Sequence, residues 1–298
     1  MNNIISVKAI ISRNLKDYKF SPKLTKDKQN EIIQLLQKAV PNFKEVDESN
    51  LNELTKRDLI LNHNAVIFYD ENNEIAINMF AGEHLSIISS SNELDSQTFD
   101  NIKALSKELN DKINFAYSDQ YGYLMSDVSK LGAGIRLECE MSLPAINSLG
   151  KIDQLATNIK RLGYTLSSTD NEDVFVVETK CNLGLKEQEI YDDFFKIISN
   201  IESIENESLS ILKIESIDEL TDKVYRAVAN LKYAHMINSG ELIDSIVKIQ
   251  VGLNLDLELK EIGSEKLSKL IQLYKQYNSI EESKKTKIDL AQQISKVL

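Results

Sequence analysis

The spacing of apolar residues changes along this chain, and that change is the strongest constraint on its fold. From 135 to 143 apolar and polar residues alternate strictly, as in a strand with one buried face. From about residue 186 onward, apolar residues recur at helical spacing instead. A chain with both periods is predicted to fold as an α+β protein.

Shorter periodic segments give the order of the other elements. A hairpin is predicted over 64–79, with a turn at Asp70–Asn73. A further strand is predicted over 173–179. No repeat and no Pro-, Gly- or Ser-rich linker separates two halves, so we expect one domain with a helical tail. Helices are predicted over 25–40, 97–113, 151–162, 186–203, 217–237 and 240–251, followed by an amphipathic stretch over 264–298.

The charge balance excludes one broad class of function. The chain has 35 Lys and Arg residues against 46 Asp and Glu residues, a net charge of −11. Because phosphate contacts need a positive surface, we expect no nucleic-acid partner, although a local basic pocket could bind an anion. The hydrophobic content of 42% is enough for a folded core rather than a disordered chain.

Membrane and disulfide classes are excluded on similar grounds. No apolar run approaches the roughly 20 residues that cross a bilayer, and Met1 does not begin a signal peptide. We therefore expect a cytoplasmic protein without a membrane partner. Cys139 and Cys181 are too few for a disulfide framework and lack zinc-site spacing, which predicts buried free thiols and no metal site.

No catalytic motif is evident from the residues alone. The chain lacks a phosphate-binding Gly-Lys-Ser loop, a His-Glu-x-x-His pair and a Gly-x-Ser-x-Gly turn. His63, His84 and His235, the last on a predicted helix, are expected to be structural. Gly132 and Gly134 are expected to form a tight turn, with close approach to a phosphate as the alternative.

A family resemblance extends this interpretation. The run from Ser12 to Phe20 resembles the Ala-Arg-Asn-Leu-x-x-x-x-Phe segment of the ATP:guanido phosphotransferases, particularly the bacterial protein arginine kinases. Further segments are similar to that family in the same order. They are Ile77–Ile87, Phe115–Leu124, Leu131–Arg136, Leu143–Ala145, Asp222–Ala227 and Val251–Asp256.

The resemblance implies a fold and a reaction. The expected fold is a twisted antiparallel sheet flanked by helices, similar to that of glutamine synthetase. It implies a guanido kinase-like domain over 1–257 and a C-terminal helical tail over 258–298. The implied reaction moves the γ-phosphoryl group of ATP, with Mg²⁺, onto arginine in a protein.

The resemblance also implies site residues. The family's Ser-x-Arg-x-Arg motif falls on Ser6, Lys8 and Ile10, so one cation is kept as lysine and one is lost. Lys8, His84 and Arg136 are the implied nucleotide-binding residues. Glu83, where the family has aspartate, is the implied catalytic carboxylate. The plain alternative for Arg136 is an ion pair with Glu138 or Glu140 on its strand.

Other family positions have lost their chemistry. The family's adjacent glutamates become Ala81 and Gly82, its next arginine becomes Ser86, and its reactive cysteine becomes Asp127. The late Arg-Gly-x-x-Gly-Glu loop is replaced by 166–172, and the C-terminal phosphoarginine motif, over 286–291, keeps only its alanine. Each lost transition-state charge costs about 100-fold to 1,000-fold in rate.

Three functions follow for testing. The leading hypothesis is a pseudokinase with a binding or regulatory role, whose protein partner is an active arginine kinase or stress-response protease machinery; a homodimer is left open. The second is an active kinase that uses Lys8 and Arg136 on phosphates and Glu83 as base. The third is a nucleotide- or anion-sensing domain without catalysis.

Overall fold

The computed structural model describes residues 3–61, 65–180, 183–259 and 262–298. Its contacts group the chain into two compact units, which are described separately. Unit 1 comprises residues 1–5, 139–177 and 197–298, and unit 2 comprises residues 6–138 and 178–196. The predicted division between 1–257 and 258–298 remains a prediction.

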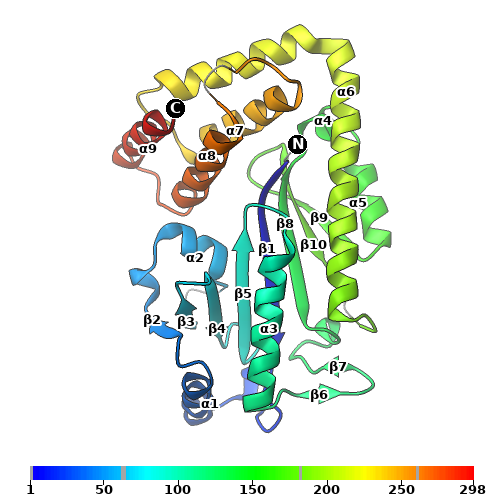
Figure 1. Cartoon of the computed structure of the whole chain (residues 1–298), viewed down its shortest axis with the longest axis vertical. Coiled ribbons are helices and arrows are strands. Elements are labelled where there is room, and N and C mark those ends of the chain that lie inside the picture. The colour runs from blue at the N-terminus through cyan, green and yellow to red at the C-terminus, as the bar shows by residue number, and fades with distance from the viewer. Residues whose placement is uncertain (1–2, 62–64, 181–182, 260–261) are drawn as a thin grey trace. The chain divides into compact units, whose positions relative to one another are not determined.

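The main sheet has eight strands in the order β2-β3-β4-β5-β1-β8-β10-β9 (Figure 1). The pairs from β2 through β5 to β1 are antiparallel, which confirms the expected α+β class with an antiparallel sheet. The strands are β1 Ile4–Arg13, β2 Lys44–Val46, β3 Val66–Asp70, β4 Ile75–Met79, β5 Leu85–Ser91, β8 Ile135–Ser142, β9 Tyr164–Ser168 and β10 Val174–Thr179. A small separate sheet pairs β6 (Tyr117–Ser118) with β7 (Gly122–Tyr123).

Helices flank the sheet. They are α1 Lys26–Ala39, α2 Glu53–Leu59, α3 Ser96–Ile113, α4 Pro144–Ser148, α5 Ile152–Arg161, α6 Glu187–Tyr233, α7 Ser239–Asn254, α8 Ser264–Tyr277 and α9 Lys284–Val297. Within unit 2, α3 runs along β5 (Figure 1). Among the described residues, no helix combines the length and the apolar content that a membrane crossing needs.

The pairing of β1 with β5 decides which side chains share one face of the sheet. Ile10 lies opposite Ile88, and Ser12 lies opposite Ser86. Ile10 and Ile88 belong to an apolar cluster that also contains Leu59 from α2. We call this side of β1 and β5 the α2 face.

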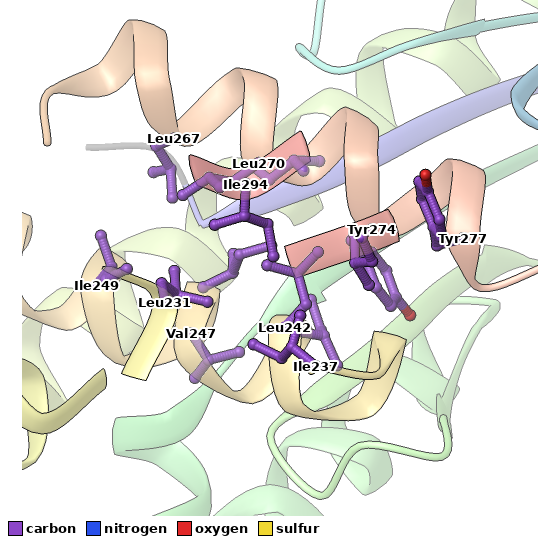
Figure 2. Close-up of a cluster of buried hydrophobic side chains, with 14 of the residues drawn as sticks. Leu231, Ile237, Leu242, Val247, Ile249, Leu267, Leu270, Tyr274, Tyr277 and Ile294 are labelled. Atoms are coloured by element: carbon purple, nitrogen blue, oxygen red, sulfur yellow. The ribbon is translucent and has the colours of Figure 1, made fainter. Parts of the chain in front are cut away.

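In unit 1, helices α7, α8 and α9 share one large apolar cluster with Leu231 of α6 (Figure 2). Leu242 and Val247 of α7 meet Leu270 of α8 and Ile294 of α9 in this cluster. Burial of such side chains contributes roughly 2 kcal/mol each. The residues after 258 therefore pack with helices that precede them.

Two predictions about the α6 region were wrong. The helix expected over 186–203 continues to residue 215, because buried polar residues such as Glu205 and Ser208 interrupt the apolar period by which its length was judged. A break at Ser216, whose φ and ψ are not helical, separates it from the helix expected from 217 onward. That second helix ends at Tyr233, so His235 follows it rather than lying on it. The amphipathic stretch expected over 264–298 is helical and contains α8 and α9.

Strands β1 and β5 were missed in the sequence because they are buried on both faces over much of their length. Burial on both faces removes the regular alternation of apolar and polar residues, and in β5 four of the seven residues are serines. The predicted thiol is confirmed at Cys139, which is free and buried, and burial raises the pKa of that thiol well above its ordinary value. Cys181 and His63 lie outside the described residues.

A buried carboxylate joins α6 to α4 in unit 1. Glu205 is 2% exposed and accepts hydrogen bonds from the backbone N–H groups of Ala145 and Ile146, at 2.8 and 2.9 Å. It caps the amino-terminal end of α4, where those groups lack helical partners. Burial raises the pKa of Glu205 to about 7, and the nearby Asp173 adds to the rise.

This arrangement predicts a pH-dependent stability. The folded-state pKa lies above the ordinary value of 4.5, so the proton that favours folding is lost as pH rises through 7. The free energy of unfolding should fall by up to about 3 kcal/mol between about pH 5 and pH 8. Glu205→Gln, which stays neutral, should flatten that dependence in urea denaturation. Glu207→Gln, exposed on the same helix, is the control; equal slopes in both variants would contradict the assignment.

Candidate functional site

Two of the implied nucleotide-binding residues, Lys8 on β1 and Arg136 on β8, lie close together in unit 2. Burial lowers the pKa of Lys8, and the nearby positive charge of Arg136 lowers it further. Lys8 Nζ donates to the backbone oxygen of Arg57 at 3.1 Å. Arg136 Nε lies 2.9 Å from Glu138 Oε1 and 3.8 Å from Glu178 Oε1. Both cations are therefore already engaged by protein groups.

Carboxylates surround these cations. Glu138 and Asp58 both act on Lys8, and they oppose the effect of burial on its pKa. Burial raises the pKa of Glu178, while Arg136 opposes that rise. The acidic groups come from α2, β8 and β10. Arg57 and Lys130 add positive charge to the same region, so its cations and carboxylates are present in similar number, without the large excess of positive charge that a triphosphate needs.

Two other positions that the resemblance assigns to arginines carry no charge. Ile10 is buried in the apolar cluster of the α2 face with Leu59 and Ile88. Ser86 is buried, and its hydroxyl lies 2.9 Å from that of Ser12. The α2 face therefore shows apolar packing and paired hydroxyls where the family implies cations.

Glu83, the implied catalytic carboxylate, holds three segments of unit 2 together. It is 6% exposed, and its Oε2 accepts from Asn14 Nδ2 at 2.5 Å and from the Ser126 hydroxyl at 2.7 Å. The Ser126 backbone N–H also donates to it at 2.9 Å. A carboxylate engaged in this way must release these donors before it can take a substrate proton.

His84 is fully buried and has both ring nitrogens engaged. Nδ1 accepts from the Leu15 backbone N–H at 2.9 Å, so it carries no proton. Nε2 lies 2.8 Å from the Lys19 backbone oxygen and must be the donor. Burial lowers the pKa of His84, consistent with this neutral tautomer. The rings of Tyr18 and Phe20 pack edge-on against it.

The four implied residues therefore form two groups. Lys8 and Arg136 lie together on the sheet, whereas Glu83 and His84 hold the chain that follows β1. Among the described residues, no hydrogen bond or ion pair joins Glu83 to Lys8 or Arg136.

The sequence analysis assigned no role to Arg13, which organises this part of unit 2. Its guanidinium is fully buried, donates to Glu187 at 2.6 Å and to the Ala133 backbone oxygen at 2.9 Å, and stacks 3.5 Å from the centre of the Tyr123 ring. Gly134 has φ of +63°, and a Cβ there would lie 2.8 Å from Arg13 Nη1. Gly134 thus allows close packing against Arg13, in line with the expected tight turn. The resemblance of the Ser12–Phe20 segment to the family motif was the sequence signal that could have pointed to Arg13.

The remaining positions of the family site also carry residues that differ from the family pattern. Ala81 and Gly82, where the family has glutamates, lie in the loop between β4 and β5. Asp127 is exposed. In unit 1, the segment 166–172 is a tight β9–β10 hairpin whose Thr169 backbone N–H donates to the Val174 oxygen at 3.2 Å. Among the described residues, no cluster of three His, Cys, Asp or Glu side chains could hold a metal ion.

Comparison with known proteins decides the family. A sequence model described as "ATP:guanido phosphotransferase, C-terminal catalytic domain" matches residues 17–208. The chain belongs to the ATP:guanido phosphotransferase family. The protein-arginine kinase of Clostridium botulinum is 25% identical, over 96% of this chain and 90% of that protein. The protein-arginine kinase of Exiguobacterium sp. is 24% identical, over 85% of this chain and 79% of that protein.

Solved structures of the family show the same fold. Lombricine kinase superposes with a TM-score of 0.61 at 14% identity, over 72% of this chain and 69% of that one. The duplicated taurocyamine kinase of Schistosoma mansoni with bound transition-state analogue components gives a TM-score of 0.60 at 15% identity, over 81% of this chain and 42% of that one. These neighbours confirm the expected guanido kinase fold, a sheet flanked by helices.

The contacts of Glu83 predict a structural effect of its mutation. Glu83→Gln removes a charged acceptor from two donors of Ser126 and leaves an amide facing them, so the free energy of unfolding should fall by about 2 kcal/mol. Urea denaturation measures this loss. Glu71→Gln, at the exposed β3–β4 turn, should leave stability unchanged. A Glu83→Gln protein as stable as its parent would show that these hydrogen bonds do not form.

Proposed function

We propose that this chain is a protein-arginine-kinase-like member of its family in which phosphotransfer is impaired and the fold serves a binding or regulatory role. The main observation behind this proposal concerns Lys8 and Arg136, the two positions where the chain keeps a cation of the family site. Both are engaged by protein groups and faced by carboxylates.

The first support is electrostatic. Kinases of this family act on ATP, whose triphosphate needs several free cations. Here Lys8 and Arg136 face Asp58, Glu138 and Glu178. A bound triphosphate would have to displace these carboxylates or sit beside them at a high electrostatic cost. The residues present therefore do not fit ATP with Mg²⁺ well, and no reaction step is assigned to it.

The second support concerns the base. Ala81 and Gly82 cannot act as proton acceptors, and Glu83 is engaged by Asn14 and Ser126. Loss of a base and of one oriented cation would each cost at least about 100-fold in rate. Even with strong non-additivity, turnover falls far below that of an intact site.

The binding role rests on what the chain keeps. Its relatives that are named protein-arginine kinases match it over most of its length, and it retains their fold while the site is altered. Within this proposal it acts in the cytoplasm on a protein partner, either an active arginine kinase or stress-response protease machinery, as a monomer or a homodimer. The guanido kinase-like domain spans 1–257, and the tail spans 258–298.

An active arginine kinase with a rearranged site is the second candidate. The Arg136 side chain is 41% exposed, so it could turn toward a phosphate in place of Glu138. In that case Glu83 would be the base.

A phosphotransfer assay separates the two candidates. Incubation with ATP, Mg²⁺ and an arginine-containing protein should yield no acid-labile phosphoarginine, because free cations and a free carboxylate are missing. An active bacterial protein-arginine kinase under the same conditions is the positive control. Clear turnover would overturn the proposal, and its loss in Glu83→Gln, under conditions where that variant remains folded, would establish the second candidate.

Removing the carboxylates tests the electrostatic argument directly. Glu138→Gln combined with Glu178→Gln removes two of the carboxylates that face Lys8 and Arg136 and should strengthen ATP binding, measured by calorimetry, by at least about tenfold. Glu71→Gln combined with Glu93→Gln removes the same charge from exposed positions of unit 2 and should change nothing. Tight ATP binding by the unmodified protein would contradict the argument and favour a nucleotide-sensing domain.

A further inference from the structure

His84 fastens the chain that follows β1 to the loop before β5, within unit 2. Its Nδ1 accepts from the Leu15 backbone N–H at 2.9 Å, and its Nε2 donates to the Lys19 backbone oxygen at 2.8 Å. Its own backbone N–H donates to Asn14 Oδ1 at 2.9 Å. These bonds join one fully buried residue to both ends of residues 15–20, which we call the clamped segment.

The far end of the clamped segment has few other anchors. The Tyr18 hydroxyl donates to Glu31 of α1 at 2.7 Å, but this contact is exposed. The Phe20 backbone oxygen accepts from the Lys23 backbone N–H at 2.9 Å, which is a contact within the same stretch of chain. The rings of Tyr18 and Phe20 instead pack edge-on against His84. His84 therefore supplies the buried anchor at this end.

The geometry leaves no place for a second proton on the ring. The lone pair of Nδ1 accepts from the Leu15 N–H, so a proton on Nδ1 would make two N–H groups face each other across 2.9 Å. The imidazolium would also be a buried charge without room for water. Protonation therefore requires the ring and the Leu15 backbone to separate.

The groups that face the ring do not remove this conflict. Burial lowers the pKa of His84 from its ordinary value of 6.5, and the Lys19 backbone oxygen and the Glu83 carboxylate only partly oppose this. The pKa of Tyr18 is raised to about 12 by its hydrogen bond to Glu31, so the phenol stays neutral in acid. Burial thus keeps His84 neutral while the segment is closed.

Other charged groups near the clamped segment are exposed or paired. The charged side chains at positions 16, 17 and 19 are exposed. Lys28 and Glu31 of α1 are exposed and form an ion pair at 2.6 Å. The buried Arg13, just before the segment, is paired with Glu187 at 2.6 Å. Solvent screens the exposed charges, so burial and Glu83 remain the main influences on His84.

We propose that His84 is a pH-sensitive clamp, which takes up a proton from solvent at Nδ1, releases Leu15 and Lys19, and lets the clamped segment open. Opening also separates the rings of Tyr18 and Phe20 from His84. Histidine suits this role because its ordinary pKa lies close to neutral pH.

The direction of the pH dependence follows from linkage. Neutral His84 favours the closed segment, so its stabilisation is complete above pH 6.5 and is lost as pH falls below that value. In the open segment the ring regains its ordinary pKa. The open fraction should therefore rise by up to about tenfold for each pH unit below 6.5.

Glu83 is the competing trigger for any change in acid, because it holds Asn14 and Ser126 and is itself titratable. The experiment must therefore separate the two groups. The proposal does not depend on whether the chain transfers phosphate, because it uses neither Lys8 nor Arg136.

Hydrogen exchange and NMR on the full chain test the proposal. Exchange of peptides covering residues 15–20, corrected for the intrinsic effect of pH, should accelerate at least about tenfold between pH 7.5 and pH 5. In parallel, ¹⁵N signals of the imidazoles report protonation. The chain has three histidines, so the signal that remains in both His63→Asn and His235→Asn belongs to His84. We expect the Nε2–H tautomer at pH 7.5 and a titration below 6.5.

A matched pair of variants assigns the effect. His84→Asn keeps an acceptor for the Leu15 N–H but cannot take up a proton, so exchange of residues 15–20 should no longer depend on pH after correction. Its level should be higher throughout, because the bond to Lys19 is lost. His235→Asn, at an exposed position of unit 1, should keep the dependence of the unmodified protein.

Three outcomes would overturn the proposal. The first is a His84 titration at or above pH 6.5. The second is a titration of His84 that leaves the exchange of residues 15–20 unchanged, and this result needs no variant of His84. The third is an unaltered pH dependence in His84→Asn, which would assign the acid effect to Glu83.

Discussion

The antiparallel pairing of β1 with β5 is the constraint on which the candidate site depends. Because side chains alternate along a strand, this register places Lys8, Ile10 and Ser12 on one face of β1, opposite the Ser90, Ile88 and Ser86 side of β5. A slip of one residue would turn all of them to the other face. The same strand ends in Arg13, whose buried guanidinium is held by Glu187 and Tyr123. The strand thus positions the side chains of the α2 face. It also positions the segment after β1, to which Glu83 and His84 are hydrogen-bonded.

The family fold persists here although several residues at positions that the resemblance assigns to its site differ from the family pattern. The fold depends on apolar burial and on buried hydrogen bonds, and these remain: Glu83 with Asn14, and His84 with the backbone of Leu15. The chemistry depends on charged groups that project from the same framework, and these are replaced or neutralised. Stability and catalysis place different demands on a site, so one can survive where the other declines.

The sequence predicted much of the fold because several elements have clear periods. The β8 strand and the α3 helix appear within one residue of their expected limits. The β1 strand was missed because burial on both faces removes alternation, and the first part of α6 was predicted too short because the buried Glu205 interrupts its apolar spacing. The resemblance pointed to Lys8 and Arg136, and strand alternation gave the Arg136–Glu138 ion pair as the alternative for Arg136. Residue order cannot show that Glu178 and Asp58 would also face these cations.

The sequence by itself determined the family, the α+β class, the acidic balance and the absence of key arginines, because these depend on residue types and their order. Only the tertiary structure decided how the remaining groups are used. Strand pairing brings Arg136 beside Glu178, folding brings Asp58 of α2 near Lys8 of β1, and Glu83 is engaged with Ser126. Such pairings join residues far apart in the chain, and their electrostatic and desolvation energies exist only once the chain has folded.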